Sequence, residues 1–306
     1  MNSSEPKKLH SAAYFTDHRD FWWNPDFLML MATRWNVSKV KTILDVGCGQ
    51  GHWGRALLPI FTQPVHLIGI DAEPKWIDIA MGRAATVDPM HKLEYRTGLA
   101  EKLPFDDDSF DLVTCQTVLI HVKDPLVALK EILRVLRPGG LIVAAEPNNA
   151  APIITLDSVK KDLSLGDRLR MAKLQLTCDM GKEALGEGNN MRGDLLPHYF
   201  FSLGLEDVRS YLSDMADFYV PPYATSREKA GLTTMVGEIE KGNYMCDQAE
   251  TKRYFLAGGG SEKEFNKIWH ILGQYNQELL RQIKQNALCL PGGALFYLTS
   301  ARKKKG

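Results

Sequence analysis

The stretch "TILDVGCGQGHWG", residues Thr42–Gly54, runs from an apolar segment directly into four closely spaced glycines. The apolar residues predict a short strand, and the helical pattern of "GRALLPIF" begins at the last glycine. A strand that enters a helix through a glycine-rich turn brings backbone N–H groups close to a ligand, because glycine has no Cβ and tolerates positive φ. The stretch therefore predicts a ligand-binding turn at the end of a strand.

Further apolar runs alternate with helical patterns on both sides of this turn. We expect strands at residues 66–71, 92–98, 110–116 and 141–147, an edge strand within 206–220 and a closing strand near the end of the chain. Asp124 is the expected N-cap of a helix over 124–140, with Pro125 at its first position. This alternation predicts an α/β fold with a doubly wound, mostly parallel, seven-stranded sheet. Ligands of such sheets lie beyond the carboxyl ends of the strands.

The rest of the chain is expected to cover and close this sheet. The predicted division is an N-terminal helical arm over the ligand at residues 1–40, a ligand-binding core at 41–150, a helical insertion at 151–200, closing strands at 201–222 and 290–306, and a helical cap at 223–289.

Composition narrows the class of protein. The 306 residues include 37 basic and 37 acidic side chains, so no global positive field exists to hold nucleic acid. The five cysteines form no CxxC pair and are expected to be free thiols in a reducing compartment. The sequence shows neither a signal peptide nor a membrane-spanning apolar run, which predicts a cytoplasmic protein. The acidic turn Asp106–Ser109 is expected to be a solvated loop, so no metal site is predicted.

The glycine spacing separates two kinds of cofactor loop. A dinucleotide fold requires GxGxxG or GxGxxA, and Gly47 and Gly49 fit that pattern, but His52 occupies the third position. The glycines instead fall at 47, 49 and 51, with Asp45 two residues before the first. The resulting D-V-G-C-G-Q-G resembles motif I of the class I S-adenosylmethionine-dependent methyltransferases.

Later stretches strengthen the resemblance. Asp71 ends the second predicted strand, where a carboxylate can accept two hydrogen bonds from a ribose diol, although NAD would use the same acid. Three further segments are similar to the same family in order and spacing: "GLAEKLPFDDDSFDLV", "CQTVLIHVKDP" and "LKEILRVLRPGGLIVAAEPN". Together these segments extend the resemblance over residues 42–148.

The resemblance implies S-adenosylmethionine as cofactor and a role for each matching residue. These implied contacts are Gly47, Cys48 and Gly49 with the amino acid part, Asp71 with the ribose, Ala72, Leu99 and Ala100 with the adenine, and Gln116 with the methionine end. One departure stands out, because relatives often carry an aspartate where this chain has Leu99. Without that acceptor, either backbone groups hold the adenine amino group or the adenine is held more loosely.

Aromatic residues of the N-terminal segment are candidates for contact with the cofactor. The segment "YFTDHRDFWWNPDFLML" resembles the arm that covers the cofactor in one bacterial branch of the family. A ring face attracts a sulfonium by roughly 0.5 to 2 kcal/mol, which makes Trp23 a candidate cofactor contact. Packing within the core or the arm is the alternative role for Phe21, Trp22 and Trp23.

The expected function is methyl transfer to a small-molecule acceptor at an O, N or C atom under the helical cap. His121, just after the fourth strand, is the candidate catalytic residue that accepts a proton from the acceptor, and it equally suits a structural role in its loop. The alternatives are a protein or RNA acceptor and a non-catalytic protein that binds S-adenosylmethionine. The chain has "CQTV" where amino-directed nucleic-acid methyltransferases carry [DNS]-P-P-[YFW], and no membrane partner is expected. Sequence reasoning leaves the oligomeric state open.

Overall fold

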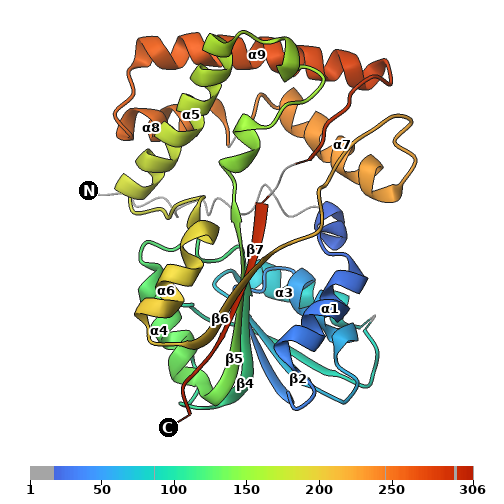
Figure 1. Cartoon of the computed structure of the whole chain (residues 1–306), viewed down its shortest axis with the longest axis vertical. Helices are drawn as coiled ribbons and strands as arrows, with labels where there is room; N and C mark the ends of the chain where they lie inside the picture. The colour runs from blue at the N-terminus through green and yellow to red at the C-terminus, as the bar shows by residue number, and fades with distance from the viewer. Residues whose placement is uncertain (1–16, 86, 245, 293–294, 306) are drawn as a thin grey trace.

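The computed structural model describes residues 17–85, 87–244, 246–292 and 295–305, and it places a sheet lobe below a helical lobe (Figure 1). The seven strands are β1 (Thr42–Val46), β2 (His66–Asp71), β3 (Lys92–Thr97), β4 (Phe110–Gln116), β5 (Leu136–Asn148), β6 (Glu206–Leu212) and β7 (Leu295–Arg302). Their order is β3-β2-β1-β4-β5-β7-β6, and in this sheet β7 runs antiparallel to both of its neighbours. The doubly wound, mostly parallel, seven-stranded sheet is thus confirmed.

Helices cover both faces of the sheet. Ile43 and Leu67 face one side, which α1 (Pro25–Trp35) and α2 (His52–Leu57) cover, followed by the short 3-10 helix η3 (Leu58–Ile60). The other side, which includes Leu44 and Val113, packs against α4 (Pro125–Val135) and α6 (Leu196–Ser202). Along the sheet edge, α3 (Pro74–Ala84) packs on β2 and β3. Because both faces are buried, the central strands read as nearly continuous apolar runs.

Two boundaries differ from the sequence prediction. The helix after β1 begins at His52, two residues earlier than expected, because Gly51 adopts a left-handed conformation with φ +73° and ends the turn. The helix α4 starts as predicted, with the Asp124 side chain accepting the Leu126 N–H at 2.9 Å. The strand that follows begins at residue 136 rather than 141, because the extended Leu136 already pairs with Phe110 ahead of a bulge.

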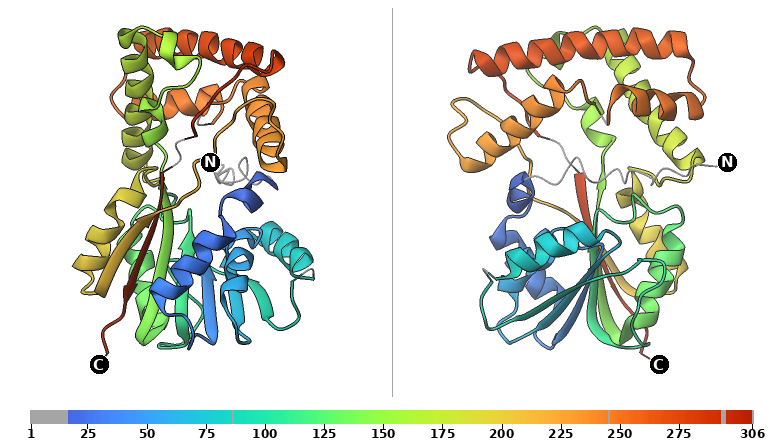
Figure 2. Two further views of the ribbon diagram at one scale, coloured as in Figure 1. Left: turned by 45° about the vertical axis from the view of Figure 1, so that its right-hand side comes forward. Right: turned by 180° about the vertical axis from the view of Figure 1, so that it is seen from behind.

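The helical lobe has a hydrophobic core of its own. It is built from α5 (Leu165–Ala184), α7 (Ser226–Glu240), α8 (Gln248–Ala257) and α9 (Glu262–Lys284), seen from two further sides in Figure 2. Leu174, Tyr254, Phe255 and Phe265 lie in this core. The backbones of α5 and α8 approach so closely that a Cβ at Gly181 would lie 1.8 Å from the carbonyl oxygen of Tyr254.

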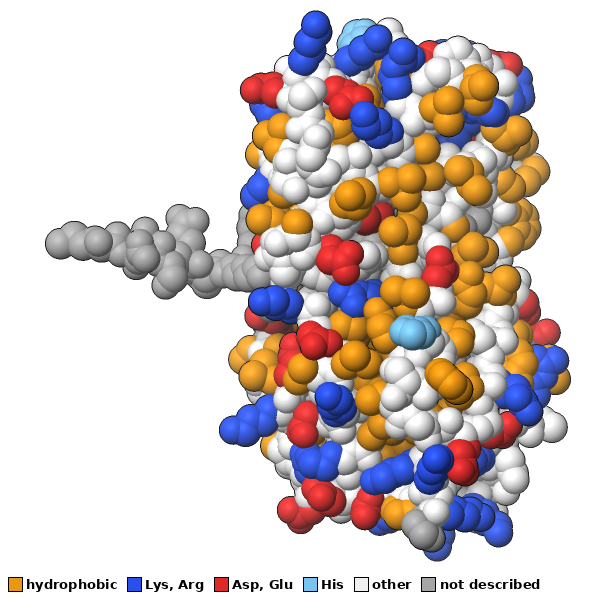
Figure 3. All heavy atoms as spheres, turned by 60° about the vertical axis from the view of Figure 1, so that its left-hand side comes forward, with side chains coloured by type: hydrophobic (Ala, Val, Ile, Leu, Met, Phe, Trp, Pro, Cys, Tyr) orange, Lys and Arg blue, Asp and Glu red, His pale blue; other side chains and the backbone are white. Residues whose placement is uncertain are grey.

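The two long helices of this lobe differ in their apolar pattern. In α9 the buried residues fall on one stripe, which predicts an ordinary amphipathic helix. In α5 a second apolar stripe faces outward, formed by the exposed Leu165, Leu169, Leu176 and Met180. Figure 3 brings this side of the molecule forward and shows apolar side chains on both lobes. The helix α5 therefore has apolar residues on both its buried and its exposed sides.

Short helices connect the two lobes. Of the expected N-terminal arm, residues 1–16 lie outside the described residues, and the remainder forms η2 (Asp17–Phe21) and α1. The helix η2 contacts α2 in the sheet lobe and α7 in the helical lobe. The other connecting helices are η4 (Ala151–Ile154), η5 (Lys160–Asp162) and η6 (Arg192–Leu195). Over the described ranges, every helix is too short or too polar to span a bilayer.

Candidate active site

The glycine turn after β1 requires glycine for two separate reasons. Gly47, Gly49 and Gly51 have φ values of +66°, +52° and +73°, a region that other residues rarely adopt. In addition, a Cβ at Gly47 would lie 2.4 Å from a methyl group of Val118, and one at Gly51 would lie 2.7 Å from the Tyr95 hydroxyl. The turn is thus pressed against the loop after β4 on one side and against β3 on the other.

Asp71 is hydrogen-bonded to this turn. Because β1 and β2 are parallel neighbours, their carboxyl ends meet, and the Gly49 N–H donates to Asp71 Oδ2 at 2.9 Å. The Glu73 N–H donates to Oδ1 at 2.9 Å, and the Cys48 N–H donates to the carbonyl of Ile70 at 2.8 Å. Burial raises the pKa of Asp71. An ionised carboxylate offers about four acceptor positions, so Asp71 retains capacity for hydroxyl groups of a ligand.

Asp45 lies beneath the turn and is almost fully buried. Its Oδ2 atom accepts the Gly54 N–H at 3.1 Å, whereas Oδ1 has no hydrogen-bond partner among the described residues. Burial is the main cause that raises the pKa of this carboxyl to about 8. A buried polar atom without a partner costs about 1 to 3 kcal/mol, so this atom suits a polar partner that the described residues do not supply.

The remaining predicted cofactor contacts lie along the same edge of the sheet. Ala72 follows β2, Leu99 and Ala100 follow β3, and Gln116 ends β4. Leu99 is 56% exposed, which is unusual for a leucine and leaves an apolar side chain open beside the end of β2. The fold therefore brings together, at one edge, the residues that the resemblance singles out.

The aromatic residues of the arm divide between the core and a cavity. Trp23 is buried and packs against Trp53 and Phe296, with ring centroids 4.8 and 5.7 Å away. Trp22 instead lines the cavity described next and packs on Phe296 at 5.3 Å. Trp22, rather than the predicted Trp23, is thus the tryptophan of the pair that faces open space.

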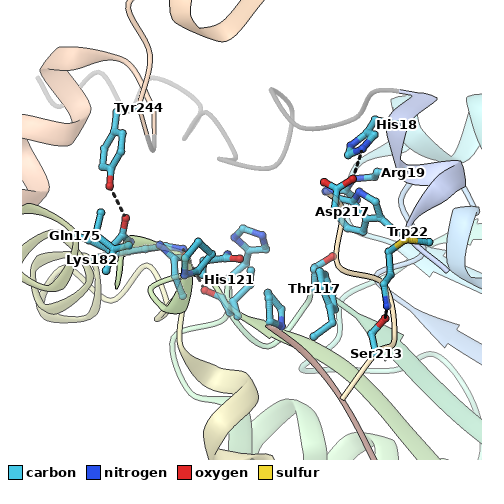
Figure 4. A pocket seen from close by; sticks show the side chains of 18 of the residues that line it. His18, Arg19, Trp22, Thr117, His121, Gln175, Lys182, Ser213, Asp217 and Tyr244 are labelled. Atoms are coloured by element: carbon cyan, nitrogen blue, oxygen red, sulfur yellow. Dashed lines mark hydrogen bonds and ion pairs between the residues drawn. The ribbon is translucent and has the colours of Figure 1, made fainter. Parts of the chain in front are cut away.

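A cavity of about 510 Å³ lies between the two lobes (Figure 4). The sheet lobe contributes Thr117, Ile120 and His121 from the loop after β4. Helix α5 contributes Gln175 and Lys182, across the cavity from Trp22. The loop after β4 therefore contacts the glycine turn through Val118 and lines the cavity through Thr117, Ile120 and His121.

A buried glutamate, which sequence reasoning missed, holds this loop. Glu146 on β5 accepts the N–H groups of Val118, Leu119 and Ile120 at 2.8, 2.9 and 3.4 Å. It is fully buried, and burial raises its pKa to about 7. The signal that could have identified it from the sequence is an acidic residue inside the apolar run of β5. Glu146 fixes the loop that carries His121 into the cavity.

A network of buried polar side chains forms the opposite wall, and it was also missed. Lys182 donates to Asn190 Oδ1 at 2.6 Å and to the carbonyl of Ile120 at 3.2 Å. The amides of Asn190 and Gln175 donate to Asp179 at 2.8 and 3.0 Å. Burial lowers the pKa of Lys182 to about 8. The network ties α5 to the loop after β4, which is the wall that carries His121.

The match to a known protein family lies in the sheet lobe. The family described as "Methyltransferase domain" matches residues 44–144, from β1 into β5. An uncharacterized methyltransferase of Schizosaccharomyces pombe is 31% identical over 140 residues, which cover 44% of this chain and 50% of that protein. A demethylmenaquinone methyltransferase of Oceanobacillus iheyensis is 33% identical over 143 residues, covering 47% and 57%. The chain spans about half the length of the curated relatives it matches.

Among solved structures, the YcgJ protein from Bacillus subtilis is similar with a TM-score of 0.49 and 18% identity, covering 92% of this chain and all of that one. The family match ends within β5, before the helical lobe begins. The family match therefore supports a methyltransferase domain in the sheet lobe.

Proposed function

We propose that this protein is an S-adenosylmethionine-dependent methyltransferase that methylates a small molecule held in the cavity between its lobes. The observation that carries the proposal is the position of the loop after β4. Val118 of this loop abuts the glycine turn, and His121 of the same loop lines the cavity. A methyl donor in the turn and an acceptor in the cavity would meet at this loop.

The residues at the edge of the sheet fit the cofactor. The positive-φ glycines set the path of the backbone that would meet the amino acid part of the cofactor, and Asp71 has acceptor capacity for the two ribose hydroxyls. Ala72, Leu99 and Ala100 would line the adenine, and Gln116 would approach the methionine end. The bound cofactor supplies an electrophilic methyl group on its sulfonium. The chain's own residues orient the acceptor within about 3 to 3.5 Å of that methyl and exclude water.

The exposed Leu99 determines how the adenine is held. It offers apolar surface where an aspartate would offer an acceptor, so recognition of the adenine amino group falls to backbone groups near Ala100. Trp23 supports the site indirectly in this proposal, because it packs beneath Phe296, which lines the cavity.

The size of the cavity favours a small acceptor. Pockets for small molecules enclose roughly 300 to 1,000 Å³, and the volume here is about 510 Å³. A protein or RNA segment would need an open groove instead. In this proposal the acceptor atom is an oxygen, nitrogen or carbon, and His121 accepts its proton.

Titration calorimetry with the full chain tests the cofactor. We expect S-adenosylmethionine to bind and NAD not to bind. Asp71→Ala should weaken S-adenosylmethionine at least tenfold, about 1.4 kcal/mol, because the ribose hydroxyls lose their acceptor. Asp78→Ala, an exposed carboxylate on α3, is the matched control and should bind as the wild type does. Tight NAD binding, or equal affinities for both variants, would contradict the proposal.

Replacing His121 tests the role in proton transfer. If His121 accepts the acceptor's proton, His121→Ala should lower turnover by about 100-fold and leave the Kd for S-adenosylmethionine unchanged. Single-turnover kinetics with a methylated product as readout would measure this step. Wild-type turnover in the variant would reduce His121 to a structural residue.

A further inference from the structure

We propose that the acceptor carries an anionic group that docks on Lys182, with an apolar body extending toward the loop after β4. This inference rests on the proposed function and names the chemical class of its substrate. Figure 4 shows Lys182 beside Gln175 at one end of the cavity and Trp22 and Ser213 at the other, with His121 between them. The anionic end would thus lie on α5, with the reacting atom toward His121.

The ammonium group of Lys182 has an unused donor. An ammonium donates three hydrogen bonds, and this one makes two within the described residues, to the carbonyl of Ile120 and to Asn190. The side chain is 1% exposed and lines the cavity. A buried ammonium with an unused donor is costly, so an anion in the cavity would accept the hydrogen bond that the described residues do not accept.

The carboxylate that compensates Lys182 lies behind the cavity wall. Asp179 does not line the cavity, and the amides of Gln175 and Asn190 already hydrogen-bond both of its oxygens. Its negative charge is therefore turned away from the space that a ligand would occupy. The helical wall therefore presents the ammonium group of Lys182 to the cavity, whereas the carboxylate of Asp179 does not contact a ligand there.

Positive groups outnumber negative ones around the rest of the cavity. Its described lining includes Arg19 and Lys160 as well as Lys182, and a single carboxylate, Asp217. Asp217 is paired with His18 at 3.1 Å, and Lys160 is paired at 3.6 Å with Asp157, which does not line the cavity. Because these two groups are paired, the proposal relies on Lys182 as the cation that meets the anionic group.

The apolar residues that line the cavity favour an acceptor with an apolar body. Trp22, Ile153, Met171, Tyr275 and Phe296 line the cavity. Burying apolar ligand surface there is favourable by roughly 25 cal/mol per Å². The lining as a whole thus suits an amphiphilic acid rather than a sugar, a polyol or a fully neutral hydrocarbon.

The test uses 2-naphthoate and its neutral analogue 2-naphthamide on the full chain without cofactor, so that its result does not depend on methyl transfer. Binding is followed by NMR with ¹³C-labelled methionine methyl groups, because Met171 and Met215 line the cavity. We expect both methionine signals to shift and naphthoate to bind at least tenfold more tightly than naphthamide. Lys182→Met should abolish that preference.

Lys173→Met is the matched control, since Lys173 lies on the same helix but is exposed and paired with Glu264. It should keep the wild-type preference. Equal affinities of the two probes for the wild type, probe binding that leaves Met171 unshifted, or a folded Lys182→Met variant with its preference intact would overturn the inference. If Lys182→Met fails to fold, the comparison of naphthoate with naphthamide on the wild-type protein still tests the inference, because it needs no variant. Failure here with intact S-adenosylmethionine binding would leave the proposed function standing.

Discussion

The glycine turn of the sheet lobe and the helical wall of the cavity are built from different kinds of atoms. On the sheet side, backbone N–H groups, glycines and carboxylates at strand ends make the contacts, as in the bond from Gly49 to Asp71. On the helical side, a network of buried side chains does so, with Lys182 and Asp179 at its centre. A binding site made of backbone atoms is fixed once the fold is fixed, whereas a binding site made of side chains can change by substitution. The first suits a constant cofactor and the second a particular acceptor.

Glycine shows the same contrast between the lobes. In the turn after β1, Gly47 is needed for its positive φ and for its approach to a neighbouring loop. In the helical lobe, Gly181 is needed only because two helix backbones touch there. Substituting each glycine should therefore damage a different property of the protein.

Gly181→Ala should produce the largest effect. The new Cβ would lie 1.8 Å from the carbonyl oxygen of Tyr254, so α5 and α8 must separate, and we expect a loss of about 3 kcal/mol in the free energy of unfolding. Urea denaturation measures this loss. Gly273→Ala on α9 meets nothing within 4 Å and should instead stabilise the protein by about 0.5 to 1 kcal/mol. If folded Gly181→Ala also lost affinity for S-adenosylmethionine, the helical lobe and the cofactor site would not be independent.

Gly47→Ala should lower the free energy of unfolding less than Gly181→Ala does, but it should weaken cofactor binding. Because Val118 must move away from the new methyl group, we expect the affinity for S-adenosylmethionine to fall about 30-fold, roughly 2 kcal/mol. Gly204→Ala separates strain from contact, since Gly204 has φ +71° and nothing within 4 Å. That control should lose about 1 kcal/mol of stability and bind the cofactor normally. Equal cofactor affinities in the two variants would remove the special role of the turn.

Glu146→Gln probes the loop between the glycine turn and the cavity, and its effect appears only as a change of stability with pH. Burial raises the Glu146 pKa from 4.5 to about 7, so the folded state holds a proton that the unfolded state has released. Its contribution to stability is therefore full below pH 4.5 and is lost as pH rises through 7. Relative to the variant, which cannot titrate here, the wild type should lose about 2 kcal/mol between pH 5 and pH 8. Parallel stability curves would show that Glu146 does not titrate in this range.

Sequence reasoning succeeded where backbone geometry dictates the residue. The class of sheet follows from alternating apolar runs, and the turn follows from glycines at 47, 49 and 51. The meeting of Asp71 with this turn follows from parallel strands whose ends share an edge. These features are local in sequence or are fixed by strand order, so spacing alone could predict them.

The helical wall could not be predicted for the opposite reason. Lys182 and Ile120 are far apart in the chain, and nothing in the pattern of α5 marks that lysine as buried. Trp22 and Trp23 are chemically identical neighbours, and only the packing of the arm decides which of them faces the cavity. Sequence reasoning also passed over Glu146, although an acid within an apolar strand was visible.

The place of β7 in the sheet has a consequence for synthesis on the ribosome. β7 lies between β5 and β6, yet it follows both in the chain, after the whole helical lobe. Since chains emerge from the ribosome N-terminus first, the edge of β5 that later pairs with β7 stays unpaired while α5, α7, α8 and α9 are being synthesised. The helices of that lobe are therefore synthesised beside an unfinished sheet. The cavity acquires its full set of walls only when β7 inserts.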